Sequence, residues 1–242
     1  MTPLQILLAV LVIAIIGYGG YLFAPIVRAV RDTKPLMEAT VPYVQNPTAP
    51  SMRILVMGDS TVVGTGGRPE ESIAGRLGAR YPEAMIVNDS ENGLKLEAFL
   101  DRLEVRTEER YDLVVFQIGA NDVIGMTPEE DIRARLTTAL EQASVMAPHI
   151  IVICAGNVGL APVFRWPLSA LYTERSRSVR KLYLEVIALY PTARYVDLFN
   201  EREDEPFNKD IERYYAADRF HPSGDGYGIW FEKVEAALAD AG

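Results

Sequence analysis

A serine after an apolar run and a histidine before a proline have the residue types and positions that nucleophilic catalysis requires. Ser60 follows the apolar run 53–57 almost directly, and Gly58 between them allows a tight turn. A serine hydroxyl attacks a substrate only when a base removes its proton, and histidine commonly serves as that base. His221 is followed by Pro222, which disfavours helical geometry at His221 and indicates a loop. Ser60 and His221 are therefore a candidate nucleophile and base.

A carboxylate lies close to the candidate base. Asp218 precedes His221 by three residues, so it can accept a hydrogen bond from the imidazole Nδ1 and fix the tautomer whose Nε2 faces the nucleophile. The alternative reading of Asp218 is a helix or turn cap. The second histidine, His149, precedes the apolar run 150–153. We expect His149 at the amino end of that strand, away from the candidate site, in a structural role.

Three groups are candidates for binding the negative charge that develops on a substrate oxygen during acyl transfer. They are the backbone N–H of Ser60, the backbone N–H of Gly93 and the side-chain amide of Asn121. Gly93 lacks a β-carbon, so an acyl group can approach its backbone closely. Ordinary turn chemistry is the alternative for both, as an Asx turn at Asn121 and a helix-entry glycine at Gly93.

Short apolar runs alternate with helical patterns in the body of the chain. The predicted strands are 53–57, 84–87, 113–118, 150–153 and 195–196, and the predicted helices lie near 70–81, 93–106, 128–146, 172–190 and 224–240. Runs that are apolar throughout indicate a parallel sheet covered on both faces. We therefore expect a three-layer α/β/α sandwich with a flavodoxin-like, parallel five-stranded sheet. Such sheets place their chemistry beyond the carboxyl ends of the strands, where the candidate residues fall.

The candidate residues stand in four short blocks whose order matches a known superfamily. The blocks are Gly-Asp-Ser ending at Ser60, the turn at Gly93, Gly-x-Asn-Asp around Asn121, and Asp-x-x-His ending at His221. Over nearly all of residues 51–242 the chain resembles the SGNH hydrolases, also called GDSL esterases and lipases. It departs from that pattern at Thr61, which replaces the leucine of the GDSL name, and at Leu94-Lys95, where many relatives carry a polar pair.

The resemblance implies hydrolysis of carboxylic esters or thioesters through an acyl-serine intermediate, without a metal or organic cofactor. In such a reaction His221 takes the proton of Ser60 and returns it to the leaving group, while Asp218 orients the imidazole. Ser60, Gly93 and Asn121 form the oxyanion hole that the resemblance implies.

The substrate is left open by the sequence. One hypothesis is a membrane-anchored esterase acting on acyl chains, such as lysophospholipids or acyl thioesters. The alternatives are a carbohydrate O-deacetylase of the same fold and a non-catalytic, membrane-tethered binding protein. The apolar segment 157–168 either lines an acyl pocket or faces the membrane, or it folds over the sheet edge as core. The natural ester and the oligomeric state are not encoded in any motif found here.

An uncharged segment near the N-terminus predicts a membrane anchor. Residues 4–24 carry no charged side chain, and at about 1.5 Å per residue such a helix spans roughly 30 Å, the thickness of a bilayer's hydrocarbon core. A cleaved signal peptide and a buried core helix are the alternatives, but the segment lacks a basic start and a small-residue cleavage pattern. Arg28, Arg31 and Lys34 follow it, so the positive-inside rule places the catalytic domain in the cytoplasm.

Composition sets the remaining boundaries. We expect an anchor with its juxtamembrane segment at 1–31, a proline-rich linker without regular helix at 32–50, and the catalytic domain at 51–242.

A formal charge of −9, with no basic cluster beyond the juxtamembrane stretch, argues against nucleic-acid binding. A single cysteine, Cys154, excludes an intrachain disulfide. The acidic run 201–205 is most simply a solvated loop.

Overall fold

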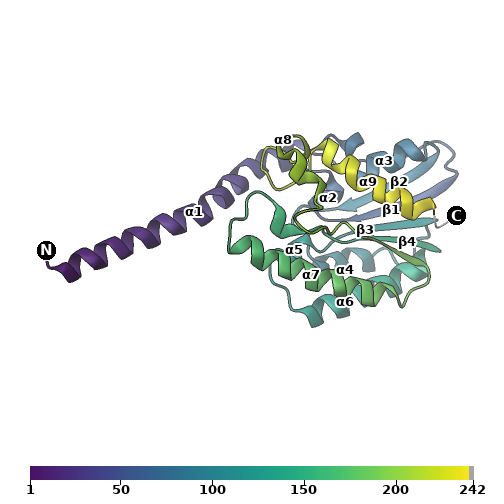
Figure 1. Ribbon diagram of the computed structural model, residues 1–242. Coiled ribbons are helices and arrows are strands. Elements are labelled where there is room, and N and C mark those ends of the chain that lie inside the picture. The colour runs from purple at the N-terminus through teal and green to yellow at the C-terminus, as the bar shows by residue number, and fades with distance from the viewer. Residues whose placement is uncertain (240–242) are drawn as a thin grey trace.

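A parallel sheet forms the centre of the computed structural model, which describes residues 1–239 (Figure 1). Its strands are β1 (Met52–Gly58), β2 (Ala84–Ser90), β3 (Leu113–Gln117), β4 (His149–Ile153) and β5 (Ala193–Val196). They run in the order β2-β1-β3-β4-β5, and every neighbouring pair is parallel. This order is that of flavodoxin-like folds, so the predicted sheet is confirmed.

Helices connect the strands. They are α2 (Ser60–Val63), α3 (Ile73–Arg80), α4 (Leu96–Glu104), α5 (Ala120–Ile124), α6 (Glu129–Met146), α7 (Leu168–Ile187), α8 (Ile211–Tyr214) and α9 (Gly224–Ala239). Three 3₁₀ segments accompany them, η1 (Pro69–Glu71), η2 (Val158–Leu160) and η3 (Pro206–Lys209). Each predicted helix is present with ends shifted by a few residues. Residue 240, where the last helix was expected to end, lies outside the described residues.

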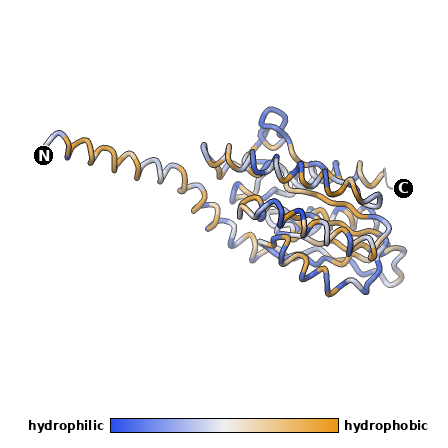
Figure 2. The backbone as a smooth tube through the Cα atoms, turned by 90° about the horizontal axis from the view of Figure 1, so that it is seen from below, coloured by the Kyte–Doolittle hydropathy of each residue, from blue (hydrophilic) through white to orange (hydrophobic). Residues whose placement is uncertain are grey.

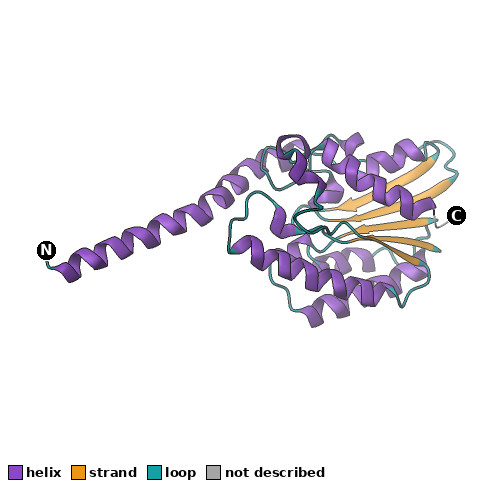
Figure 3. Ribbon diagram, viewed as in Figure 1, coloured by secondary structure: helices purple, strands orange, loops and turns teal. Residues whose placement is uncertain are grey.

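The sheet is covered on both faces, as Figure 3 shows. Alternate side chains of β1 point to opposite layers because successive residues of a strand face opposite sides. Ile54 and Val56 belong to the core cluster that includes residues of α3 and α9. Leu55 and Met57 belong to the cluster that includes residues of α4, α6 and α7. This arrangement confirms the expected three-layer sandwich.

The N-terminal helix α1 (Pro3–Ala39) extends away from the domain (Figure 1). Its apolar stretch, seen in Figure 2, is long and apolar enough to cross a membrane, and only 6% of that window is buried. The expectation that residues 32–50 contain no regular helix is wrong for residues 32–39, because α1 continues through Pro25 and Pro35. A proline inside a helix removes one backbone hydrogen bond, but Ala29 and Thr33 of α1 contact the domain and favour the helix.

The rest of the expected linker is extended and attached to the sheet. The backbone N–H of Gln45 donates to the Ile86 carbonyl at 3.2 Å, and the Ile86 N–H donates back to the Gln45 carbonyl at 2.8 Å. The segment therefore adds a short antiparallel bridge beside β2. The helices that directly follow β1 and β3, namely α2 and α5, lie at the end of the domain where α1 joins it (Figure 1). The carboxyl edge of the sheet thus faces the long helix.

Candidate active site

The position of Ser60 depends on close packing at the end of β1. Gly58 is the last residue of β1, and a Cβ at this residue would lie 2.0 Å from the Gln117 carbonyl oxygen on β3. Only glycine allows the two strands to approach this closely. The chain then enters α2, of which Ser60 is the first residue. Ser60 is therefore presented at the carboxyl end of β1, as the sequence predicted.

Asp59 stabilises the turn that carries Ser60. Its Oδ1 accepts hydrogen bonds from the backbone N–H of Thr61 at 3.0 Å and from the Thr61 hydroxyl at 2.7 Å. Burial raises the pKa of the Asp59 carboxyl, and the two bonds from Thr61 act in the opposite direction. The threonine that replaces the leucine of the GDSL name thus has a structural function, because its hydroxyl supports a buried carboxyl group next to Ser60.

Ser60, His221 and Asp218 form a continuous hydrogen-bonded series. His221 Nε2 lies 2.9 Å from Ser60 Oγ, and His221 Nδ1 lies 2.6 Å from Asp218 Oδ2. All three residues are buried, with exposed fractions of 8%, 5% and 2% for Ser60, His221 and Asp218. A base that contacts both a hydroxyl and an orienting carboxylate is the arrangement that activates a serine.

A short loop before α9 sets the orientation of His221. Asp218 Oδ1 accepts the backbone N–H groups of Phe220 and His221, each at 3.0 Å. Arg219 adopts a positive φ of 57° and closes this turn. His221 lies outside any helix, as the following proline indicates. Asp218 therefore makes both kinds of contact, because one carboxylate oxygen caps the turn while the other contacts the imidazole.

The Asp218 carboxylate is ionised at neutral pH. Burial by itself would raise its pKa, but the hydrogen bond and the charge interaction with His221 outweigh burial and lower the pKa below its ordinary value of 3.8. A carboxylate in this state favours the correct imidazole tautomer and stabilises the imidazolium that forms during proton transfer.

Asn121 lies close to this series on α5. Its Nδ2 donates to the Leu94 carbonyl oxygen at 3.0 Å and lies 3.5 Å from Asp59 Oδ2. Asn121 lines the same pocket as Ser60. The side-chain amide therefore reaches across from α5 to the loop between β2 and α4, and does not form the local turn considered as an alternative.

Gly93 lies in that loop between β2 and α4. Its φ is +80°, a conformation that side-chain-bearing residues rarely adopt, and no described atom lies within 4 Å of a Cβ built there. Gly93 itself is not among the described residues that line the pocket. The structure thus joins Ser60, Asp218, His221 and Asn121, while Gly93 is one residue away from the Leu94 carbonyl that Asn121 contacts.

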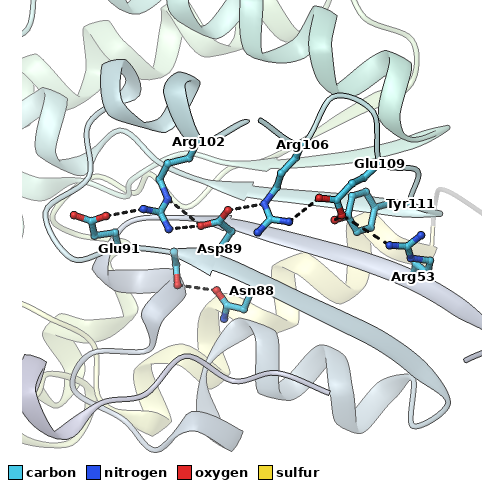
Figure 4. A network of polar contacts seen from close by, with 9 residues as sticks. Arg53, Asn88, Asp89, Glu91, Arg102, Arg106, Glu109 and Tyr111 are labelled. Carbon is cyan, nitrogen blue, oxygen red and sulfur yellow. Dashed lines mark hydrogen bonds and ion pairs between the residues drawn. The ribbon is translucent and has the colours of Figure 1, made fainter. Parts of the chain in front are cut away.

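Ion pairs fix the loop that carries Gly93 (Figure 4). Asp89, at the end of β2, accepts Arg102 Nε at 2.9 Å and Arg106 Nε at 2.5 Å, and both arginines belong to the α4 region. Arg102 also donates to Glu91 at 2.7 Å. Burial opposes ionisation of Asp89, but the two guanidinium groups outweigh it and lower the pKa of this carboxyl. The network ties both ends of the loop together.

A small pocket opens beside Ser60. Its volume is about 80 Å³, well below the several hundred Å³ typical of pockets for drug-sized ligands. Most of the residues around the reacting groups are apolar, and they include Ile118, Val158, Ala161, Leu198, Phe220 and Trp230. The pocket beside Ser60 is therefore small and largely apolar.

The apolar segment 157–168 is divided between two environments. Val158 and Ala161 line the pocket, and Val163 is buried with an exposed fraction of 5%. Trp166, in contrast, is 70% exposed. The first part of the segment is therefore core and pocket wall, and its tip is a solvent-accessible aromatic residue.

Two residues at the site were missed by the sequence analysis. The expectation of a solvated loop at 201–205 is wrong for Glu205, which is 8% exposed, lines the pocket and accepts the Phe207 N–H at 3.2 Å. Charge density along the sequence gave no sign of this burial. Thr33 of α1 is the second, since its hydroxyl donates to Asp218 Oδ2 at 2.8 Å across 185 positions. The local sequence around Thr33 gives no sign of this contact, because its partner lies 185 positions away. His149 is an exposed residue at the start of β4, as expected.

Comparison with known proteins places the chain in a family. Residues 56–229 match the GDSL-like lipase/acylhydrolase family, so the chain belongs to that family. A GDSL-like esterase of Mycobacterium tuberculosis is 24% identical over 201 residues, which are 78% of this chain and 62% of that relative. The chain thus spans less than two thirds of that relative's length.

Solved structures share the fold. TesA is 21% identical with a TM-score of 0.61, and the match covers 78% of this chain and 99% of TesA. A lipolytic G-D-S-L family protein from Veillonella parvula is 16% identical, with a TM-score of 0.60 and coverage of 77% and 98%. An acetylxylan esterase from Geobacillus stearothermophilus is 21% identical, with a TM-score of 0.53 and coverage of 78% and 95%. These likenesses agree with the α/β sandwich described above.

Proposed function

We propose that this chain is a serine hydrolase that cleaves carboxylic esters through an acyl-serine intermediate. The single observation that carries the proposal is the hydrogen-bonded series from Ser60 Oγ through His221 to Asp218 Oδ2, with distances of 2.9 and 2.6 Å. Membership of the GDSL-like lipase/acylhydrolase family supports it.

The proposed reaction has two halves. Ser60 Oγ attacks the ester carbonyl carbon while its proton passes to His221 Nε2, and the resulting tetrahedral intermediate expels the alcohol, which takes that proton. Water then attacks the acyl-serine and gives a proton to Nε2, and Ser60 recovers this proton when the acid is released. Asp218 stays ionised throughout and stabilises the imidazolium.

The oxyanion of each tetrahedral intermediate requires donors that are already in place. We assign this role to the backbone N–H of Ser60, the side-chain amide of Asn121 and the backbone N–H of Gly93. Asn121 shares the pocket with Ser60, which supports its assignment directly. For Gly93 the support is its place in the loop that Asn121 contacts through Leu94.

The pocket favours a short acyl group. A volume of about 80 Å³ with a largely apolar wall suits an acetyl or similarly small acyl chain better than a long fatty acyl chain. The same pocket size also supports the second candidate, a carbohydrate O-deacetylase of the same fold, since the acyl group that it removes is acetyl. A second support is that an acetylxylan esterase is among the similar structures. In both cases the reaction at Ser60 is the same, and the alcohol portion differs.

We also assign residues 4–24 of α1 as a single-pass membrane anchor. The proline-rich segment and the domain from residue 51 onward then lie together on one side of the membrane. Arg28, Arg31 and Lys34 follow the apolar run and favour a cytoplasmic catalytic domain. A reporter that fluoresces only in the cytoplasm, fused to the C-terminus, tests this orientation.

Hydrolysis of p-nitrophenyl esters by the full chain in detergent tests the proposed function. We expect kcat/KM to be greatest for acetyl or butyryl esters and to fall with longer chains. Ser60→Ala abolishes the activity, and Ser178→Ala, which changes an exposed serine on α7, leaves it unchanged. Release of acetate from acetylated xylooligosaccharides distinguishes the deacetylase. Folded protein that shows no Ser60-dependent hydrolysis of any ester would overturn the proposal and favour a tethered binding protein.

A further inference from the structure

The C-terminal half of α1 packs against the catalytic domain along one stripe. Leu22 and Ala29 are buried, and Ile26 and Thr33 are partly buried, whereas most of the intervening residues are exposed. Spacings of three and four residues place side chains on one face of a helix. The face turned toward the domain therefore includes Thr33, and α1 is attached to the body along more than two turns.

Contacts with the segment 157–168, here called the pocket loop, hold this stripe in place. Ala29 shares an apolar cluster with Ala161 and Val163, and Ala161 also lines the pocket. Nearer the membrane, the Arg165 guanidinium lies 4.2 Å from the centre of the Tyr21 ring and donates to the Tyr21 carbonyl at 3.1 Å. The helix thus has a defined position relative to the active site.

Thr33 donates one of the four hydrogen bonds that the Asp218 carboxylate accepts. Oδ1 accepts the backbone N–H groups of Phe220 and His221. Oδ2 accepts His221 Nδ1 at 2.6 Å and the Thr33 hydroxyl at 2.8 Å. Each carboxylate oxygen has two lone-pair sites, so Thr33 occupies the site on Oδ2 that His221 leaves free. The Asp218 side chain is completely buried, so a lost donor has no ready replacement from solvent.

We propose that Thr33 of the anchor helix is a positioning residue for the reaction at Ser60, acting through Asp218 on the orientation of His221. The inference rests on the proposed hydrolase function. Thr33 touches neither Ser60 nor His221 by any hydrogen bond within residues 1–239; its hydroxyl restrains the carboxylate that holds the imidazole. The helix that anchors the protein is then also a part of its catalytic machinery.

The position of this contact places the active site close to the bilayer. Thr33 lies nine positions after Ala24, the end of the uncharged run, which corresponds to about 14 Å along a helix axis. A rigid helix of this length keeps Asp218 at a fixed distance from the membrane, which a flexible tether would not do.

Four single variants of the full-length protein in detergent test the role of Thr33. Thr33→Val keeps the size of the side chain and removes the hydroxyl, Thr33→Ala also removes it without the second branch, and Thr33→Ser retains it. Thr40→Val is the matched control, because the Thr40 hydroxyl donates to the Leu36 carbonyl of its own helix at 2.7 Å. The measured quantities are kcat and KM on p-nitrophenyl acetate, with thermal unfolding of each variant.

We expect kcat to fall about tenfold in Thr33→Val and Thr33→Ala, a barrier change of about 1.4 kcal/mol, with KM unchanged. Thr33→Ser and Thr40→Val keep kcat within about twofold of the native value. Native kcat in both hydroxyl-free variants, or an equal loss in Thr33→Ser, overturns the inference and leaves the hydrolase function intact. If the native chain neither hydrolyses esters nor reacts at Ser60 with a fluorophosphonate, both proposals fall. If Thr33→Val does not fold, Thr33→Ala and Thr33→Ser decide the question.

Discussion

The Ser60 hydroxyl lies 2.9 Å from His221 Nε2, although 161 positions separate the two residues. The sheet brings them together because β1 ends at Gly58 and the loop before α9 returns to the same carboxyl edge. The strand order changes direction at β1, because β2 lies on one side of β1 and β3 lies on the other. Open parallel sheets bind their ligands at such a point.

Gly58→Ala tests whether close packing of β1 and β3 positions Ser60. The added Cβ would lie 2.0 Å from the Gln117 carbonyl oxygen, so the strand end must shift. We expect a loss of about 3 kcal/mol in the free energy of unfolding, the upper part of the range for overpacked sites. Thermal unfolding followed by circular dichroism measures this loss. Gly17→Ala is the control, since nothing lies within 4 Å of a Cβ at Gly17, and a similar loss there would contradict the argument.

Asn121→Ala tests the proposed oxyanion donor. Removal of one such donor typically lowers kcat about 10²- to 10³-fold, and we expect this loss with little change in KM on p-nitrophenyl acetate. Asn157→Ala is the matched control, because Asn157 also lines the pocket and its amide also donates to a backbone carbonyl, that of Asn200 at 3.1 Å, but it is not one of the groups assigned to the oxyanion hole. Equal losses of kcat in the two variants would remove Asn121 from the oxyanion hole.

Asp218→Asn tests whether ionisation of the Asp218 carboxyl stabilises the folded protein. The pKa of Asp218 is lower in the folded protein than its ordinary 3.8, so its ionised form favours the folded state. This contribution is complete above the unfolded pKa and is lost as pH falls through the lower folded pKa. We expect the variant to be less stable than the native protein by about 2 kcal/mol near pH 7, as for a hydrogen bond to a buried charge, and the difference to vanish in strong acid.

Denaturant unfolding of the native protein and the variant from about pH 7 down to pH 2 measures this difference across the window defined by the two pKa values. The exposed carboxyl Asp204 supplies a control, since Asp204→Asn is expected to change stability little at any pH. A difference for Asp218→Asn that stays constant over the whole range would show that ionisation of this carboxyl does not stabilise the fold.

Trp166→Ala tests whether the pocket loop meets the membrane. Trp166 is 70% exposed, and its neighbour Arg165 contacts Tyr21 within the apolar run of α1. Aromatic side chains are favoured at membrane interfaces. We expect a threefold to tenfold lower rate on an ester carried in phospholipid vesicles, equivalent to about 1 kcal/mol of interfacial contact, and an unchanged rate on soluble p-nitrophenyl acetate.

Leu189→Ala is the control for this prediction. Leu189 is 74% exposed and follows α7 just before β5, at the amino edge of the sheet and away from α1. It should therefore leave both rates unchanged. Equal effects of Trp166→Ala on the vesicle-borne and the soluble ester would contradict a role at the membrane.

Most of the sheet could be predicted from the sequence because continuous apolar runs mark its central strands. The run 113–118 matches β3 to within one residue, and 150–153 matches all of β4 but its first residue. The strand ends carry glycine and small polar residues, so Ser60 and Asn121 were predicted from local pattern alone. Asp218 and His221 were predicted in the same way, from a spacing of three residues and a following proline.

The length of α1 and its contacts with the domain could not be predicted from local sequence pattern. Four prolines between residues 32 and 50 indicate an extended linker, yet Pro35 lies inside α1. Local rules count the hydrogen bond that a proline removes, but not the tertiary contacts of Ala29 and Thr33 with the domain. Glu205 was missed for a similar reason, since an acidic run is read as solvated unless the pocket that buries one of its members is known.

The most direct measurement for the whole account is reaction of the full-length protein with a fluorophosphonate, followed by mass spectrometry of the labelled peptide. Such probes form a covalent bond with an activated serine. We predict one adduct, on Ser60, that is lost in Ser60→Ala and forms far more slowly in His221→Ala. Folded protein that remains unlabelled, or that is labelled at another serine, would contradict the assignment of Ser60 as the nucleophile.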